Sequence, residues 1–313
     1  MLSIQNISFS YNNTPVLNQL SLDIIPGEHL SIIGASGCGK STLLKLIYGL
    51  LTPSDGNLYW NEKKLLGPDF NIVPGEDDMK YLAQDFGLMP FITASENIGK
   101  YLSNFYPIKK KKRIFELLEM VGMAEYANVK AQFLSGGQQQ RIALAQVLAQ
   151  EPKVLLLDEP FSHIDNFQKN TLRRDLFHHL KSSKITCLVA THDATDALSF
   201  ADNVLVLKDG KKIAYNTPKE LYLNPGSTYT ASLFGDVNTI DAQLFFPDRK
   251  GFLWIYPHQL KVKEDSKLRV KVLDNYFSGN GYLIKGISKG KILFFLHHTS
   301  IPSGSETGLC LNR

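Results

Sequence analysis

Residues 33–42 read Ile33-Gly34-Ala35-Ser36-Gly37-Cys38-Gly39-Lys40-Ser41-Thr42 and fit the pattern G-x-x-x-x-G-K-[ST] in full. An apolar run precedes this stretch, and an apolar segment with helical spacing follows it at residues 43–47. Glycines let the backbone curl around a phosphate with its N–H groups pointing inward, and a helix start adds a positive dipole end. Lys40 can reach the β- and γ-phosphates, and the Ser41 hydroxyl can join a Mg²⁺ shell. The stretch predicts a site for a magnesium–nucleoside triphosphate, with a glycine-rich turn that binds nothing as the alternative.

The rest of the composition is that of an ordinary globular protein. The chain has 313 residues and a net charge of +4, which permits two domains and does not by itself favour nucleic acid or membrane as a partner. The three cysteines, Cys38, Cys187 and Cys310, are too scattered for a disulfide framework and suit a reducing compartment. Cys38 lies beside Lys40 at a predicted helix start, a setting that lowers a thiol pKa, but we expect it to be a small packing residue of the loop, with a lowered thiol pKa as the alternative. No apolar run approaches the ~20 residues of a membrane-spanning helix, so we expect any membrane crossing to come from another chain.

Polar residues follow three further apolar segments. Gln84 ends a predicted strand that begins near Tyr81, Asp158 and Glu159 follow residues 154–157, and His192 follows residues 185–189. Ligand-contacting residues of open parallel sheets gather beyond the carboxyl ends of strands. Of the two adjacent carboxylates, one can hold Mg²⁺ and the other can orient or deprotonate an attacking water. A solvated strand end is the alternative for this pair.

A second predicted helix start, residues 134–138, reads Leu-Ser-Gly-Gly-Gln and also presents backbone N–H groups to an anion. It lies far along the chain from Lys40. The two helix starts can face the same phosphate only if the chain folds back on itself, or if a second copy of the protein supplies residues 134–138. Tyr11, between two predicted strands, offers an aromatic face to a nucleobase, or is a turn residue with a polar tip.

The hydrophobic pattern changes along the chain. Residues 2–9 and 20–25 alternate as antiparallel strands, whereas residues 93–105 and 109–123 have helical spacing, the first of them after a capping box at Thr93. From Val237 onward, short β-like runs are separated by glycine and proline turns. The sequence therefore predicts a domain at residues 1–235 and a small all-β domain, sandwich or barrel, at residues 236–313.

In their order and spacing these motifs resemble the ATPase subunit of an ABC transporter over residues 1 to about 230. The phosphate loop is similar to its Walker A motif, residues 154–159 to Walker B, and residues 134–138 to the LSGGQ signature. The resemblance implies an α/β P-loop ATPase domain with a mixed sheet core and antiparallel β and helical subdomains, followed by an OB- or TOBE-like domain. Three positions of the ATPase domain depart from the family pattern: His163 and Ile164 stand in the loop Ser162–Asp165 where a small residue and a leucine are common, and Gln146 replaces an arginine.

The resemblance also implies roles for individual residues. Catalysis falls to Glu159 as general base, with His192 at the γ-phosphate and Gln84. Mg²⁺ and its waters fall to Ser41, Gln84 and Asp158. The residues implied in nucleotide binding are Tyr11, Gly34, Ala35, Ser36, Gly37, Cys38, Gly39, Lys40, Ser41, Thr42, Ser135, Gly136, Gly137, Gln138 and Asp165.

The implied assembly is a head-to-tail homodimer, or a pair with a like subunit, in which residues 135–138 of one copy meet ATP bound at Lys40 of the other. Such a pair would sit peripherally on the cytoplasmic side of the membrane, drive a transmembrane permease and indirectly serve a solute-binding protein. The TOBE-like segment 255–260 favours import. One alternative is a soluble ABC ATPase acting on nucleic acid or translation, but such proteins usually have tandem ATPase units. A second alternative is a pure nucleotide-binding regulator, which would be favoured if Glu159 were missing; Glu159 is present.

Overall fold

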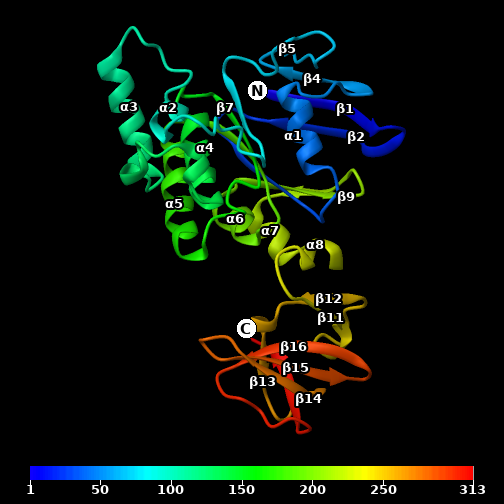
Figure 1. Ribbon diagram of the computed structural model, residues 1–313. Coiled ribbons are helices and arrows are strands. Elements are labelled where there is room, and N and C mark those ends of the chain that lie inside the picture. Colours follow the sequence, from blue (N-terminus) through cyan, green and yellow to red (C-terminus); the bar gives the residue numbers. More distant parts are fainter. Residues whose placement is uncertain (313) are drawn as a thin grey trace. The chain divides into compact units, whose positions relative to one another are not determined.

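The computed structural model describes residues 1–312, without the side chain of Asn166, and divides into two compact units after Lys219 (Figure 1). The central element of the first unit is a six-stranded sheet in the order β10-β9-β3-β8-β7-β6. All its neighbouring strands are parallel except β10, which is antiparallel to β9. The strands are β3 (His29–Ile33), β6 (Met79–Leu82), β7 (Val154–Asp158), β8 (Thr186–Ala190), β9 (Asn203–Lys208) and β10 (Lys211–Asn216).

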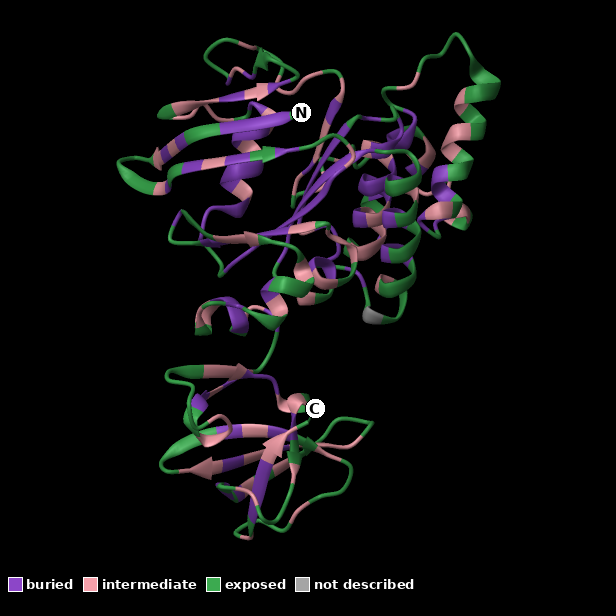
Figure 2. Ribbon diagram, turned by 180° about the vertical axis from the view of Figure 1, so that it is seen from behind, coloured by how far each residue is buried: buried purple, intermediate pink, exposed green. Residues whose placement is uncertain are grey.

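The interior strands of this sheet are apolar because both their faces are covered. Every residue of β3, β7 and β8 is buried, as the purple strands in Figure 2 show. Such continuous apolar runs are typical of parallel strands with elements packed on both sides. Because the strands are parallel, their carboxyl ends meet at one edge, where the polar residues that follow them are placed together.

A four-stranded antiparallel sheet, β2-β1-β4-β5, packs with helix α1 on one side of the six-stranded sheet (Figure 1). Its elements are β1 (Leu2–Tyr11), β2 (Thr14–Ile24), β4 (Asp55–Trp60), β5 (Lys63–Lys64) and α1 (Lys40–Tyr48). Leu43 and Leu44 of α1 share a buried core with Ile4 and Leu20 of the antiparallel sheet and with Leu156 of β7. This core fixes the helix that begins at Lys40 against both sheets.

Helices cover the opposite side of the six-stranded sheet (Figure 1). They are α2 (Ala94–Ile98), α3 (Pro107–Met120), α4 (Gly136–Leu148), α5 (Asn166–Ser182) and α6 (Ala194–Phe200), with short 3-10 turns η1 (Ala124–Tyr126) and η2 (Ala131–Phe133). Leu144 of α4 and Leu176 of α5 pack with Leu155 and Leu157 of β7 in a second buried core. No helix among residues 1–312 combines the length and apolar character needed to cross a bilayer.

The second unit is a small β-rich domain. A five-stranded antiparallel sheet, β13-β17-β14-β15-β16, and a two-stranded sheet, β11-β12, enclose a core that includes Ile240, Val270 and Phe295. The elements from α7 on are α7 (Pro218–Leu223), α8 (Thr228–Ser232), β11 (Asn238–Asp241), η3 (Ala242–Leu244), β12 (Phe252–Ile255), η4 (Pro257–Gln259), β13 (Leu260–Val262), β14 (Leu268–Phe277), β15 (Tyr282–Ser288), β16 (Lys291–His297) and β17 (Glu306–Leu311).

The structure divides the chain earlier than the sequence-based boundary after Gly235. The segment between the two points packs with the β domain, because Tyr222 stacks on Tyr256 with ring centroids 4.2 Å apart and Trp254 Nε1 donates to Thr228 Oγ1. A sequence boundary placed where helical spacing ends cannot detect such contacts. These residues therefore belong to the second unit.

Two element predictions also need correction. The helix predicted over residues 93–105 ends at Ile98, because Gly99 terminates it after the confirmed capping box between Thr93 and Glu96. The helix predicted over residues 109–123 begins earlier, at Pro107, whose fixed φ suits a first helical position, and ends at Met120. The antiparallel hairpin of residues 2–25 is confirmed, with longer strands than predicted.

Candidate functional site

The phosphate loop runs from the end of β3 into α1, as its motif predicts. Gly39, immediately before the helix, has φ +104°, and a Cβ there would lie 2.8 Å from Leu17 Cδ2 of β2. Both the left-handed backbone and the close packing demand glycine at this position. In this structure the Lys40 ammonium donates to two carbonyl oxygens of the loop, Gly34 O at 2.8 Å and Ala35 O at 3.1 Å. The lysine thus lies folded into the loop that it is predicted to serve.

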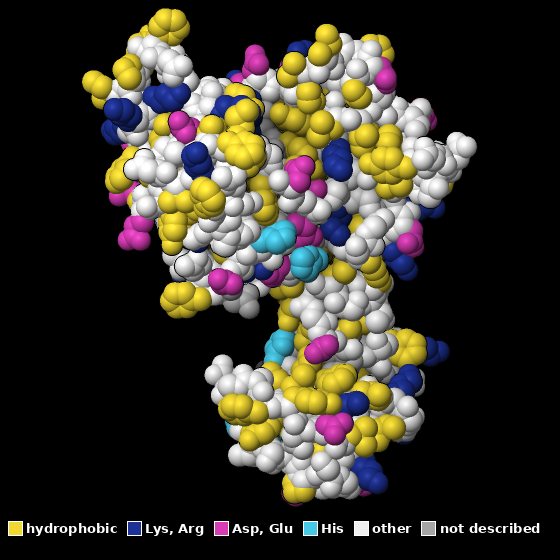
Figure 3. Space-filling model, viewed as in Figure 1, with side chains coloured by type: hydrophobic (Ala, Val, Ile, Leu, Met, Phe, Trp, Pro, Cys, Tyr) yellow, Lys and Arg dark blue, Asp and Glu magenta, His cyan; other side chains and the backbone are white. Residues whose placement is uncertain are grey.

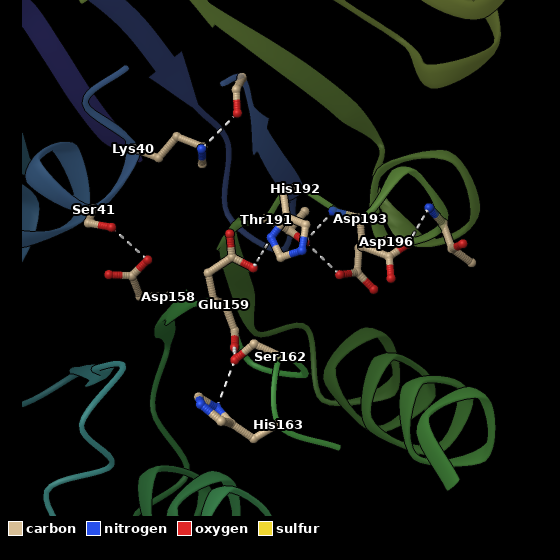
Figure 4. A network of polar contacts seen from close by, with 12 residues as sticks. Lys40, Ser41, Asp158, Glu159, Ser162, His163, Thr191, His192, Asp193 and Asp196 are labelled. Carbon is tan, nitrogen blue, oxygen red and sulfur yellow. Dashed lines mark hydrogen bonds and ion pairs between the residues drawn. The ribbon is translucent and has the colours of Figure 1, made fainter. Parts of the chain in front are cut away.

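Asp158, at the end of β7, lies beside the first turn of α1 (Figure 4). Ser41 Oγ donates to Asp158 Oδ1 at 2.9 Å, and the Tyr81 hydroxyl donates to Asp158 Oδ2 at 3.1 Å. Asp158 is almost fully buried, and Tyr81, at the end of β6, is half-buried. Burial first, and then the Asp158 carboxylate, raises the pKa of Tyr81, so the phenol stays a hydrogen-bond donor. A hydroxyl and a carboxylate are hard oxygen ligands of the kind that Mg²⁺ prefers.

Glu159 and His192 meet across the carboxyl ends of β7 and β8 (Figure 4). Glu159 Oε2 lies 2.8 Å from His192 Nδ1, with 15% of the Glu159 side chain exposed and 70% of that of His192. Glu159 has φ +52°, and its carbonyl oxygen accepts hydrogen bonds from Gln140 Nε2 at 2.8 Å and Ser162 Oγ at 3.1 Å. A non-glycine residue in this backbone region needs support from its surroundings, and these bonds supply it.

A buried ion-pair network anchors the segment that carries His192. Arg173 of α5 pairs with Asp193 and, at 2.6 Å, with Asp196 Oδ1, while Thr191 Oγ1 donates to Asp196 Oδ2 at 2.8 Å. Burial acts to raise the pKa of Asp193, but hydrogen bonds from Arg173 and Lys169 outweigh it and hold that pKa below its ordinary value. Burial raises the pKa of Asp196 against the opposing charge of Arg173. The network fixes the residues on both sides of His192.

The predicted residues from four strand ends line one cavity of about 370 Å³, which we call the P-loop cavity. Its volume falls within the range of small-molecule sites, roughly 300–1,000 Å³. Its lining residues are Tyr11, Val16, Ser36, Gly37, Gly39, Lys40, Ser41, Thr42, Gln84, Glu159 and His192. The structure thus brings together the phosphate loop, the residue predicted to stack on a base, and the groups predicted to act on a γ-phosphate.

The second helix start does not line this cavity. Ser135 caps α4 with its hydroxyl, in a capping box with Gln138, and Ser135 and Gly136 are exposed. A Cβ on Gly136 would meet open space. Asp165, at the start of α5, is also exposed and outside the lining. The capping box uses the backbone N–H groups of Ser135 and Gln138, and this exposed helix start lies outside the P-loop cavity of the same copy.

Cys38 takes the packing role that we expected. The side chain is buried and packs in the core around α1, and burial raises the pKa of its thiol, with the Lys40 charge acting in the opposite sense. The alternative of a lowered thiol pKa is not found, because sequence proximity to a lysine says nothing about desolvation.

Sequence reasoning missed three supporting residues, namely Tyr81, Gln140 and Arg173. Gln140 is 2% exposed and bridges the Glu159 turn through both ends of its amide. The available signal was a polar residue on the buried face of a helix that is otherwise apolar there. Tyr81 and Arg173 carried no such signal, because their partners lie 77 residues and 20 residues away along the chain.

A family model described as "ABC transporter" matches residues 17–162. The chain is 34% identical over 246 residues to the Fe(3+) ions import ATP-binding protein FbpC 2 of Haemophilus influenzae, which covers 78% of this chain and 69% of that protein. The chain belongs to the ABC transporter family of ATP-binding proteins.

Further relatives of this ABC protein agree. It is 32% identical over 282 residues to the spermidine/putrescine import ATP-binding protein PotA of Bacillus anthracis, covering 90% of this chain and 82% of that protein. A dimeric structure of the ATP-binding cassette MJ0796 in a post-hydrolysis state, bound to ADP and Pi, has a TM-score of 0.62 and 31% identity over 70% of this chain and 99% of that one. The structure of cbiO1 from Clostridium perfringens, part of the ABC transporter complex cbiONQ, has a TM-score of 0.61 and 29% identity, covering 71% of this chain and 90% of that one.

The predicted fold class is confirmed, and the ABC ATPase is of importer type. It binds and hydrolyses ATP and energises uptake. The import names favour this function over the alternative of an ATPase acting on nucleic acid or translation.

Proposed function

We propose that this ABC ATPase hydrolyses magnesium–ATP at the P-loop cavity, completed by residues 135–138 of a second copy, and thereby drives a permease for solute import. The observation that carries the proposal is the convergence of Lys40, Gln84, Glu159 and His192 on one cavity, while Ser135 lies outside it. The related MJ0796 cassette is dimeric in its ADP- and Pi-bound structure, which supports the pairing.

The contacts in and beside the P-loop cavity support the roles proposed for its residues. Ser41 Oγ and Asp158 Oδ1, 2.9 Å apart, are placed to hold Mg²⁺ with Gln84 at the rim, and the ion would neutralise phosphate charge when bound. Lys40 would exchange its two loop carbonyls for phosphate oxygens, and Tyr11 would stack on the base. The N–H groups of residues 34–42 would cradle the phosphates.

Hydrolysis joins a water oxygen to the γ-phosphorus and breaks the bond to the ADP oxygen. Glu159 would accept the proton of that water through its carboxylate, one oxygen of which already contacts His192 Nδ1. His192, mostly exposed, would turn toward the γ-phosphate as it leaves the Glu159 contact. Asp165, exposed at the start of α5, would link the two sites of the pair.

The surface over α2 and α3 supports a membrane partner. Phe91, Phe105 and Ile108, in α3 or in the segments that precede α2 and α3, are each at least 72% exposed. Figure 3 shows hydrophobic side chains on the surface over these helices. Exposed apolar groups of this kind mark interaction sites. We assign them to the permease, which places the ATPase peripherally on the cytoplasmic side of the membrane and makes any contact with a solute-binding protein indirect. The relatives differ in the solute that their names give, Fe(3+) ions in one and spermidine/putrescine in another.

The variant Glu159→Gln tests the catalytic assignment. We expect it to bind ATP with parental affinity, to lose roughly 10²–10⁴-fold in kcat, and to accumulate as an ATP-bound dimer in size-exclusion chromatography. Glu264→Gln, an exposed position of the second unit, is the matched control and should behave as the parent. Parental turnover by Glu159→Gln would refute the assigned base.

A further inference from the structure

His163 lies where three parts of the site meet. Its backbone N–H donates to Gln140 Oε1 at 2.9 Å. Its ring nitrogen Nδ1 lies 3.0 Å from Ser162 Oγ (Figure 4). Its ring and that of Phe86, two residues after Gln84, form a T-shaped pair with centroids 5.3 Å apart and an interplanar angle of 86°. A Cβ on Gly137 of the second helix start would lie 2.6 Å from the His163 carbonyl oxygen.

We propose that His163 is a positioning residue for ATP hydrolysis, which links the loop after Gln84 to the turn that carries Glu159. The inference rests on the proposed catalytic role of Glu159. Small residues are common at this position in the family. The link through the His163 side chain is therefore a property of this chain.

The link runs through two backbone positions that need support. Phe86 and Glu159 have φ values of +66° and +52°, a region that costs energy for residues with a side chain. On one side, the His163 ring packs against the Phe86 ring. On the other, the same ring contacts Ser162 Oγ, which in turn donates to the Glu159 carbonyl oxygen at 3.1 Å. A shift of the Gln84 loop would therefore be felt at the Glu159 backbone.

The link should affect turnover more than nucleotide affinity. None of Phe86, Ser162 and His163 is among the residues that line the P-loop cavity, whereas Glu159 is. A small side chain at position 163 would keep the backbone bond to Gln140 but would reach neither the Phe86 ring nor the Ser162 hydroxyl. The Glu159 turn would then lose its contact with the Gln84 loop without any change in the groups that hold ATP.

Steady-state ATPase assays of His163→Ala test this inference. We expect kcat to fall roughly five- to ten-fold, the lower end of the combined effect of one hydrogen bond and one ring contact because His163 is exposed, with KM for ATP within about two-fold of the parent. His163→Asn keeps a polar atom near Ser162, and His163→Phe keeps a ring near Phe86, so each should recover part of kcat. His163 is exposed, so all three variants should fold.

A double-mutant cycle with Phe86→Ala separates a positioning role from a merely local one. If His163 acts through Phe86, the double variant should lose no more kcat than the more affected single variant. His298→Ala, an exposed histidine of the second unit, is the control. Parental kcat in His163→Ala, or additive losses in the cycle, would overturn the inference. If Glu159→Gln is inactive in the same assay while His163→Ala is unaffected, the proposed function stands and only this inference fails.

Discussion

Removal of Arg173 should destabilise the first unit and displace His192. The guanidinium is 4% exposed and pairs with Asp193 and Asp196, whose side chains are 25% and 2% exposed. Breaking a fully buried pair by removing one partner costs about 3–5 kcal/mol. Asp196 meets that condition, with only the Thr191 hydroxyl opposite its other oxygen, while Asp193 is partly solvated and keeps Lys169. We therefore expect Arg173→Met to lower the free energy of unfolding by about 3 kcal/mol, at the lower end of this range.

The loss should depend on pH in a defined direction. Burial gives Asp196 a folded pKa above its unfolded value, so its charge destabilises the fold as pH rises, and without Arg173 this penalty grows. Asp193 has a folded pKa below its unfolded value, so it contributes stability above the ordinary carboxyl range and loses it as pH falls. As pH falls, the parent loses more of this Asp193 contribution than Arg173→Met does, because Arg173 is one cause of the lowered pKa of Asp193. Because the Asp193 contribution is lost only below its ordinary pKa of 3.8, Asp196 alone makes the difference between parent and variant smaller at about pH 5 than at about pH 8.

Urea unfolding measures this difference. Trp60 is 7% exposed in the core of the first unit, so its fluorescence in a Trp254→Phe background reports on that unit alone. Arg174→Met is the matched control, because it removes the same charge from the neighbouring, exposed position and should change stability by less than about 0.5 kcal/mol. The reasoning is refuted if Arg173→Met costs no more than Arg174→Met, or if the gap widens as pH falls.

Two further outcomes follow from the structure. The Cβ of Gly137→Ala would lie 2.6 Å from the backbone oxygen of His163, so this variant should lose most of its ATPase activity and melt at a lower temperature than the parent. Gly136→Ala places its Cβ in open space and should melt at the parental temperature. Equal melting temperatures for the two variants would contradict the packing argument. Burial first, and then the Lys181 charge, lowers the pKa of His29 to about 4, so folding stability should fall as pH drops from 6.5 toward 4, and His29→Phe should flatten that part of a urea-midpoint titration; an unchanged slope would exclude His29 as its source.

The sequence by itself determined the class of the fold and predicted which residues gather at the site. Glycines, a lysine and a hydroxyl at fixed spacing admit few local backbones, and a polar residue directly after a continuous apolar run marks the end of a buried parallel strand. Gln84, Glu159 and His192 could therefore be assigned to one sheet edge before any coordinates. Local chemistry of this kind is readable because it depends on residues that are neighbours along the chain.

Only the tertiary structure decided what supports that chemistry. Tyr81 beside Asp158 and Arg173 beside Asp196 are contacts between different elements, and no spacing rule predicts them. Desolvation likewise depends on everything that surrounds a side chain, which is why Cys38 proved to have a raised thiol pKa and why residues 220–235 proved to pack with the β domain. Spacing specifies which groups can react, whereas packing between distant segments fixes their protonation and their positions.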